Sequence, residues 1–239
     1  MLPTPRVLPQ TPRMQAGVRP AGRPAPASAC VPADRDAARL GAAAGRLVRP
    51  QQDVFGEGEA VRGVLILRRG WAFRYRLLAD GRRQIIHFLM AGDPIVLADG
   101  VARHSVAALT DAEVVRLPRP EIEGRLAALG RELEARSVRE QDAIIEHTIS
   151  LGRRTAKERM LCLLLEICRR SHADAPAEDG PAGFDFPATQ PVLADALGLS
   201  TVHVNRTLQM LRQEGLADLQ AGRVHIASLE DARDEAAAE

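Results

Sequence analysis

Apolar and polar positions alternate in short runs over the first half of the chain, which predicts β-strands. Trp71, Phe73 and Tyr75 are separated by single residues, and Asp80-Gly81 follows, a pair that suits a tight hairpin turn. The further runs "QIIHFL", "PIVLA", "SVAAL" and "EVVRL" lie between glycines and polar turns. This many short strands with regular turns predict an antiparallel roll or barrel.

The period of the pattern changes at Pro118, where a helix is predicted. Pro120 suits the first turn, and Glu121 and Glu123 lie where carboxylates favour the helix dipole. The helical pattern continues towards Leu151, with a break expected near Gly130.

A narrow apolar seam with charged flanks runs along this helix, which is typical of a coiled-coil partner. The seam consists of Leu133, Val138, Gln141, Ile145, Thr148 and Ile149. The helix could instead pack on its own sheet, and both contacts can hold on different faces. The pattern favours homodimerisation.

A second helical segment, "RRTAKERMLCLLLEICRR", is followed by a polar linker and then by "TQPVLADALGLSTVHVNRTLQMLRQEGL". This last stretch predicts two short helices joined by a tight turn. Thr189 is a suitable N-cap for the first helix, and Gly198 ends it because glycine adopts the left-handed conformation freely. Ser200 then caps the second helix. Two strands in "LADLQAGRVHIAS" would complete a winged helix-turn-helix.

The two faces of the second helix differ in chemistry. Val204, Leu208 and Leu211 share the inner face, whereas the outer face has no acidic residue. Arg can bind guanine, Asn or Gln can bind adenine, and Val or Thr can contact a thymine methyl group. Helix N-termini and the wing can contact phosphates. The predicted DNA contacts are Thr189, Gln190, Ser200, Thr201, Val202, His203, Asn205, Arg206, Gln209 and Arg223. The alternative is a small helical bundle with a polar surface.

Composition narrows the function classes further. The 239 residues carry a formal net charge of +1, so global charge does not indicate a polyanionic partner. Cys30, Cys162 and Cys168 have neither metal-site nor disulfide spacing, which predicts inert thiols for the last two. No apolar run approaches the roughly 20 residues of a membrane span, and no signal peptide is seen, so we expect a cytoplasmic protein without a membrane partner. With no phosphate loop, metal cluster or nucleophile elbow in the sequence, we expect neither an enzyme nor a cofactor.

The N-terminal region differs from the rest of the chain. Residues 1–35 are rich in proline and arginine and are predicted to form a disordered arm. Residues 36–48 predict a short Ala/Leu/Arg helix.

From about residue 45 to 229 the chain resembles the Crp/Fnr family of bacterial transcription regulators. The resemblance rests mainly on the helix-turn-helix stretch and on "LGRRTAKERML", which is similar to the family's hinge. "FGEGE", "LRRGWAFRY", "DGRRQIIHFL" and "AGDPI" are similar to its glycine-punctuated roll. The resemblance implies an α+β fold with an N-terminal antiparallel β-roll of the cyclic-nucleotide-binding type, a long dimerisation helix and a C-terminal winged helix-turn-helix. It also implies a homodimer on a roughly palindromic site, with half-sites about one helical turn apart.

The family's base-reading positions fall on Thr201, Val202 and Arg206. Arg206 keeps the family's arginine. Val202 stands where many members have glutamate, and Thr201 where the cyclic-AMP-responsive members have arginine. The half-site of this protein should therefore differ from theirs.

The predicted sensor region departs more strongly from the family. The Gly-Glu-Leu segment and the Arg-Ser pair that hold cyclic AMP are missing, since Arg103 is followed by His104. The four cysteines of an iron–sulfur oxygen sensor are also lacking. His87 and His104 could serve a haem-based gas sensor, but lone histidines on strands are more often structural. Arg82-Arg83 is predicted to be a solvated turn. We expect a degenerate sensor, with a roll that binds haem, a gas or a cyclic nucleotide as the alternative.

The predicted plan is an arm over residues 1–35, a β-roll over 36–118, a dimerisation helix over 119–152, a winged helix-turn-helix over 153–229 and a tail over 230–239. The expected function is sequence-specific transcription regulation. The expected partners are double-stranded DNA, a second copy of the chain and, if the protein is an activator, RNA polymerase.

Overall fold

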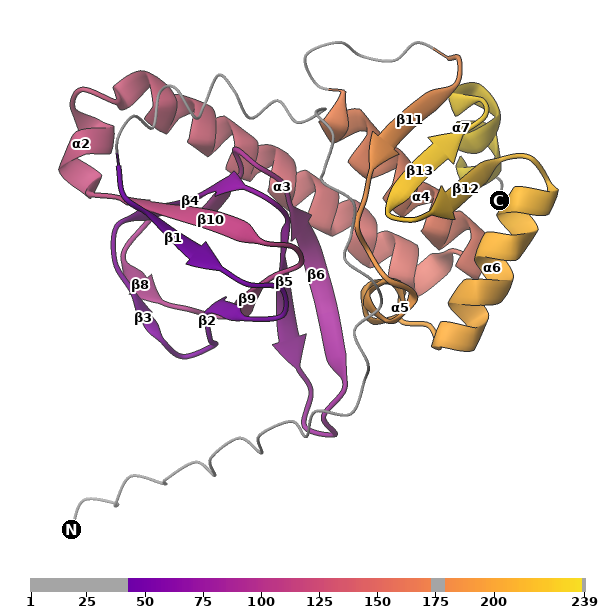
Figure 1. Cartoon of the computed structure of the whole chain (residues 1–239), viewed down its shortest axis with the longest axis horizontal. Coiled ribbons are helices and arrows are strands. Elements are labelled where there is room, and N and C mark those ends of the chain that lie inside the picture. Colours follow the sequence, from indigo (N-terminus) through magenta and orange to yellow (C-terminus); the bar gives the residue numbers. More distant parts are fainter. Residues whose placement is uncertain (1–42, 173–178, 238–239) are drawn as a thin grey trace.

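The structure, a computed structural model, describes residues 43–172 and 179–237. A β-roll, a long helix and a C-terminal helical domain follow one another along the chain (Figure 1). This arrangement confirms the α+β fold expected from the sequence. The predicted arm and Cys30 lie outside the described residues.

The roll is built from short antiparallel strands in two main sheets. One sheet has the order β1-β10-β4-β7 and the other β2-β9-β5-β6, while β3 pairs with β8. Leu67, Leu89 and Val106 are fully buried between them. The strands are β1 (Gly45–Val48), β2 (Asp53–Phe55), β3 (Ala60–Val61), β4 (Val64–Arg69), β5 (Ala72–Leu77), β6 (Arg83–Leu89), β7 (Pro94–Val96), β8 (Gly100–Val101), β9 (Ser105–Ala108) and β10 (Ala112–Leu117).

The helix predicted over residues 36–48 is wrong for its last part, because residues 45–48 form strand β1. This strand pairs with β10, from Gly45 opposite Val115 to Val48 opposite Ala112. The ladder and the burial of Val48 in the roll outweigh the local helix propensity. Residues 36–42 lie outside the described part of the chain.

The β5–β6 hairpin is exposed at its tip, where Leu77 is 56% exposed, but buried on both faces at its base. Ala72 and Leu89 belong to the core of the roll. Trp71 and Phe88 face the C-terminal domain, where their rings lie 5.6 and 5.0 Å from the ring of Phe186 between centroids. The same hairpin therefore packs on the roll and on the C-terminal domain, and β6 runs beside α5 (Gln190–Leu197).

The long helix begins later than predicted. A short α2 (Arg119–Glu123) is separated from α3 (Ala127–Arg153), so the break lies at residues 124–126 and not near Gly130. Gly130 lies inside α3, where an added Cβ would stand 2.9 Å from Ile122 Cγ2. Glycine at this position therefore allows α2 to pack closely against α3.

Helix α4 (Ala156–Ser171) follows α3 after a sharp turn that a capping box defines. Thr155 Oγ1 accepts a hydrogen bond from the Glu158 backbone N–H at 3.4 Å, and the Glu158 carboxylate accepts one from the Thr155 N–H at 2.8 Å. The turn sets the direction of α4, which enters the C-terminal domain and is almost entirely buried on one side.

The C-terminal domain contains the predicted helix pair and wing, together with two elements that the sequence pattern does not predict. Its elements are β11 (Ala182–Asp185), α5, α6 (Thr201–Gln213), β12 (Ala217–Gln220), β13 (Arg223–Ile226) and α7 (Leu229–Ala237). Strand β11 pairs with β13, so the wing is part of a three-stranded sheet. The predicted tail is helix α7, which packs on α4 through Leu229, Ala232 and Ala236. Two of these three residues are alanine, a weak apolar signal in a sequence this rich in alanine.

Candidate nucleic-acid interface

The turn between α5 and α6 has the conformation that its sequence predicts. Gly198 adopts φ +65°, and its N–H donates to the Ala194 carbonyl. Ser200 Oγ accepts from the His203 N–H at 3.2 Å and so caps α6. Thr189 is at the N-cap position of α5, but its side chain makes no capping hydrogen bond.

Helix α6 separates an apolar inner face from a polar outer face. Val204, Thr207 and Leu211 are buried, whereas Val202 is 72% exposed, and Arg206 is exposed as well. Thr201, His203 and Gln209 are also exposed, and Asn205 is half-buried. The face that the periodicity predicts to point outwards is therefore accessible to solvent. Thr207 is buried with the apolar residues, although the hydrophobic pattern does not predict this.

The predicted phosphate contacts lie at the ends of elements around α6. Thr189 and Gln190 are exposed at the start of α5, and Ser200 is exposed at the start of α6. Arg223 lies at the wing turn and is mostly exposed, but its guanidinium is 3.2 Å from an Asp185 carboxylate oxygen. A contact with DNA by Arg223 would therefore compete with this ion pair.

The seam predicted along α3 is only partly on the surface. Val138, Ile145 and Ile149 are 57%, 58% and 46% exposed, and Gln141 and Thr148 are exposed beside them. Leu133 is buried at 1% exposure against the roll. Its assignment to the seam is wrong, because the stripe turns towards the protein's own sheet at this end of the helix.

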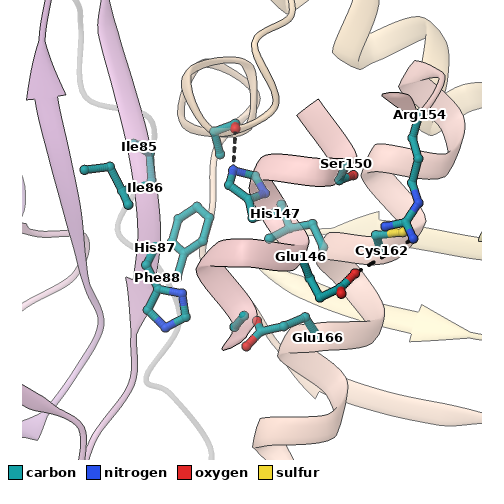
Figure 2. A pocket seen from close by; sticks show the side chains of 13 residues that line it. Ile85, Ile86, His87, Phe88, Glu146, His147, Ser150, Arg154, Cys162 and Glu166 are labelled. Carbon is teal, nitrogen blue, oxygen red and sulfur yellow. Dashed lines mark hydrogen bonds and ion pairs between the residues drawn. The ribbon is translucent and has the colours of Figure 1, made fainter. Parts of the chain in front are cut away.

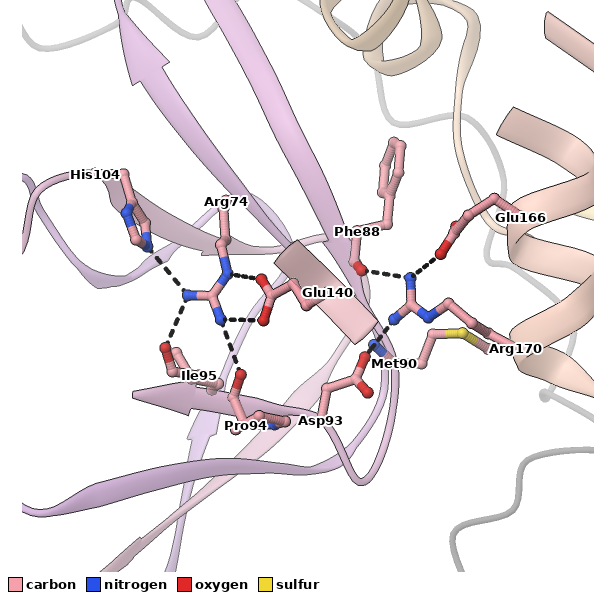
Figure 3. A network of polar contacts seen from close by, with 10 residues as sticks. All are labelled: Arg74, Phe88, Met90, Asp93, Pro94, Ile95, His104, Glu140, Glu166 and Arg170. Carbon is pink, nitrogen blue, oxygen red and sulfur yellow. Dashed lines mark hydrogen bonds and ion pairs between the residues drawn. The ribbon is translucent and has the colours of Figure 1, made fainter. Parts of the chain in front are cut away.

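A buried arginine ties the roll to α3 (Figure 3). Arg74 donates to both carboxylate oxygens of Glu140, to the Ile95 carbonyl at 2.8 Å and to the Pro94 carbonyl at 2.9 Å. Its Nη1 also lies 3.0 Å from His104 Nε2, which must accept because arginine can only donate. This guanidinium is therefore already engaged by the protein, which gives no support to a phosphate site at Arg74.

A second arginine network ties the roll to α4 in the same region (Figure 3). Arg170 donates to the Phe88 carbonyl at 3.0 Å, pairs with Asp93 and lies 3.3 Å from Glu166. Asp93 also accepts from the Met90 N–H and so shapes the turn between β6 and β7. Both α3 and α4 are thus held by ion pairs to the roll.

A small cavity of about 60 Å³ lies between β6, α3, α4 and α5 (Figure 2). Its wall includes His87, His147, Ser150 and Cys162. His147 Nε2 donates to the Ala196 carbonyl at 3.0 Å, a bond from the long helix to α5. Burial lowers the pKa of His147 and of His87, so both imidazoles are neutral at pH 7.

The thiols fit the structural role expected of them. Cys168 is buried and Cys162 half-buried, and burial raises the pKa of both. Within residues 43–172 and 179–237, no three His, Cys, Asp or Glu side chains are arranged to hold a metal ion. No helix in this part of the chain is long and apolar enough to cross a membrane.

We expect acid to weaken the folded state below about pH 6.5. Burial lowers the pKa of His104 to about 4 from its usual 6.5, and the pKa of His87 is also lowered. Between the lowered pKa of each folded-state histidine and its usual pKa of 6.5, the unfolded chain binds more protons than the folded chain. The free energy of unfolding therefore falls as the pH drops. Urea unfolding at pH 7 and pH 5 measures the effect. His104→Gln keeps an acceptor for Arg74 and should make the dependence shallower; an unchanged dependence would contradict this assignment.

Two family models match the chain. Residues 46–128 match the cyclic nucleotide-binding domain, and residues 158–231 match the Crp-like helix-turn-helix domain. These ranges correspond to the roll with the start of α3 and to the C-terminal domain from α4 onwards.

Relatives from several bacteria share most of this architecture. The chain is 32% identical over 188 residues to the transcriptional activator protein FnrL of Cereibacter sphaeroides, covering 76% of this chain and 75% of FnrL. It is 31% identical over 175 residues to the nitrogen fixation regulation protein FixK of Azorhizobium caulinodans, covering 72% and 70% of the two chains. The structure of FixK2 from Bradyrhizobium japonicum is similar with a TM-score of 0.69 at 29% identity, over 82% of this chain and 98% of FixK2. The chain therefore belongs to the Crp/Fnr family of bacterial transcription regulators and contains the family's helix-turn-helix DNA-binding domain.

Proposed function

We propose that the protein binds a palindromic DNA site as a homodimer and regulates transcription there, with α6 in the major groove. The observation that carries the proposal is the acid-free outer face of α6. Val202 and Arg206 are exposed there, while Val204 and Leu211 form the buried face. Packing does not require Arg206 to point outwards, whereas a guanine in the groove would give its guanidinium two hydrogen-bond acceptors.

The exposed part of the α3 seam supports the homodimer. Val138 and Ile145 are seven residues apart, as are Gln141 and Thr148, which is the repeat of a coiled-coil contact. A two-fold axis along this seam would pair the same residues of both chains. Two copies of α6 could then occupy half-sites about one helical turn apart.

Activation is the proposed direction of regulation. FnrL is named a transcriptional activator protein, and the probable transcriptional activator of Rhizobium leguminosarum is 32% identical over 161 residues. Contact with RNA polymerase is one way in which a DNA-bound protein activates transcription, so we include the polymerase among the proposed partners.

Selection from pooled genomic fragments by gel shift tests the DNA-binding proposal. The retained fragments should share one sequence motif with two-fold symmetry. Retention of fragments in proportion to their length, without a shared motif, would contradict sequence-specific binding by this chain.

Val202 should read a thymine methyl group at one position of each half-site. Burying a methyl group contributes about 0.8 kcal/mol, so replacing that thymine with uracil should weaken binding about three- to fourfold. The Val202→Ala variant should lose the same affinity and no longer distinguish thymine from uracil. Val202→Glu should instead favour cytosine, since a carboxylate accepts from its amino group. Fluorescence anisotropy with modified operators measures these effects, and an unchanged uracil penalty in Val202→Ala would contradict the contact.

A further inference from the structure

The β5–β6 hairpin of the roll is joined to the first helix of the helix-turn-helix by an ion pair. Arg83 Nε and Nη2 both lie 2.8 Å from Asp195 Oδ2, and the two side chains are only 26% and 31% exposed. The Arg83 guanidinium also lies over the Phe73 and Tyr75 rings, 4.9 and 5.7 Å from their centroids. The prediction of a solvated turn at Arg82-Arg83 is therefore wrong for Arg83, because its guanidinium is held by the Asp195 carboxylate and by the two aromatic rings.

The last carbonyls of α5 are also bound by groups from outside the helix-turn-helix. Gln84 Nε2, on β6, donates to the Ala196 carbonyl at 3.1 Å, and so does His147 of α3. Arg159 Nη1, on α4, donates to the Leu197 carbonyl at 3.2 Å. These carbonyls have no partners within α5, so the external donors satisfy them and fix the end of this helix.

An apolar contact supports the polar ones. Trp71 and Phe88 of the roll enclose Phe186, which is fully buried just before α5. Domains joined by a small polar contact move independently, whereas an apolar contact of this kind restricts their motion. The position of α5 is thus set jointly by the hairpin, the long helix and α4.

We propose that Arg83 and Asp195 form a latch that positions the helix-turn-helix for DNA binding and makes its orientation depend on the hairpin of the roll. This inference rests on the DNA-binding function proposed above. Neither residue is proposed to touch DNA; both are positioning residues. The latch leaves the outer face of α6 uncovered, since Val202 and Arg206 remain exposed while Asp195 is held. The latched arrangement is therefore compatible with DNA binding, and in this proposal release of the hairpin lowers operator affinity.

The latch and a direct phosphate contact predict different salt slopes for Arg83→Gln and opposite changes in affinity for Asp195→Asn. If Arg83 contacted a phosphate, Arg83→Gln would make the slope of log K against log salt shallower by about 0.9. Asp195→Asn, which removes a negative charge from a domain that approaches DNA, would then raise affinity. In the latch, both variants lower operator affinity about three- to twentyfold with the salt slope unchanged.

The test uses the full chain and its selected operator, titrated by fluorescence anisotropy over a series of salt concentrations. Arg82→Gln is the matched control, because Arg82 pairs with Asp80 within its own turn and its affinity loss should be negligible. The exchange variant Arg83→Asp/Asp195→Arg should regain most of the affinity that either charge reversal alone loses. Thermal unfolding of each variant shows that it is folded. A shallower salt slope in Arg83→Gln, tighter binding by Asp195→Asn or no recovery in the exchange variant would overturn the latch. Failure of the unmodified protein to bind any operator would instead overturn the proposed function.

Discussion

Arg206→Ala should lower specific operator affinity by about 1–3 kcal/mol, or roughly 5- to 150-fold, and relax the preference at one base pair of each half-site. Arg206 is exposed on the outer face of α6, and within the described residues it forms no ion pair that would hold it elsewhere. Its loss should therefore remove a base contact without disturbing the fold. Titration of the operator and of all single-base variants at each position measures both effects.

Arg212→Ala is the matched control for this variant. Arg212 is also exposed on α6, but it lies in the last turn, away from the N-terminal part that enters the groove in helix-turn-helix proteins. Its replacement removes the same charge and should leave base preference unchanged. Equal relaxation of preference by both variants would show that Arg206 contributes only charge.

Ile145→Asp should dissociate the proposed dimer and abolish tight operator binding at the same time. Ile145 is 58% exposed at the centre of the seam. A two-fold symmetric dimer would bury Ile145 of both chains in the interface. An unpaired carboxylate there should cost at least about 2 kcal/mol per copy, or about 4 kcal/mol per dimer, which is close to a thousandfold in the dimer dissociation constant. Sedimentation velocity and operator titration on the same samples measure the two losses.

Leu47→Asp provides the matched control, since Leu47 is 80% exposed on β1 of the roll and lies outside the seam. It introduces the same acidic side chain at an exposed apolar position and should leave the dimer intact. An intact dimer in Ile145→Asp would reject the seam on α3 as the site of association.

Two arginine networks connect the roll to α3 and α4. Arg74 holds Glu140 of α3, and Arg170 of α4 holds Asp93 of the roll. Breaking a buried ion pair by removing one partner is strongly destabilising, because the other charge is left without compensation. These contacts therefore fix the positions of α3 and α4 relative to the roll. The proposed latch between Arg83 and Asp195 also fixes the position of α5.

The helix-turn-helix could be predicted in detail because its signals are local. Gly198 must adopt a positive φ, Ser200 must cap the next helix, and the spacing of Val204 and Leu211 places both in the core. Each of these requirements can be read within a few residues of sequence. For the same reason the exposed face of α6 followed directly from the periodicity.

The errors arose where distant segments decide the outcome. Residues 45–48 form a strand because β10 pairs with them, and Leu133 is buried because the roll covers that part of α3. Arg83 gave no local signal, since its partner Asp195 is 112 residues further along the chain. Helix α7 was missed because its buried face is mostly alanine.

The most direct test of the central claim is to count the chains bound to the selected operator while varying the spacing of its half-sites. Native mass spectrometry should find two chains per duplex at the selected spacing. Inserting about 5 base pairs, half a helical turn, would place the two half-sites on opposite faces of the DNA and should reduce affinity to the non-specific level. One chain per duplex, or unchanged affinity after the insertion, would contradict a homodimer that reads a palindrome through its two copies of α6.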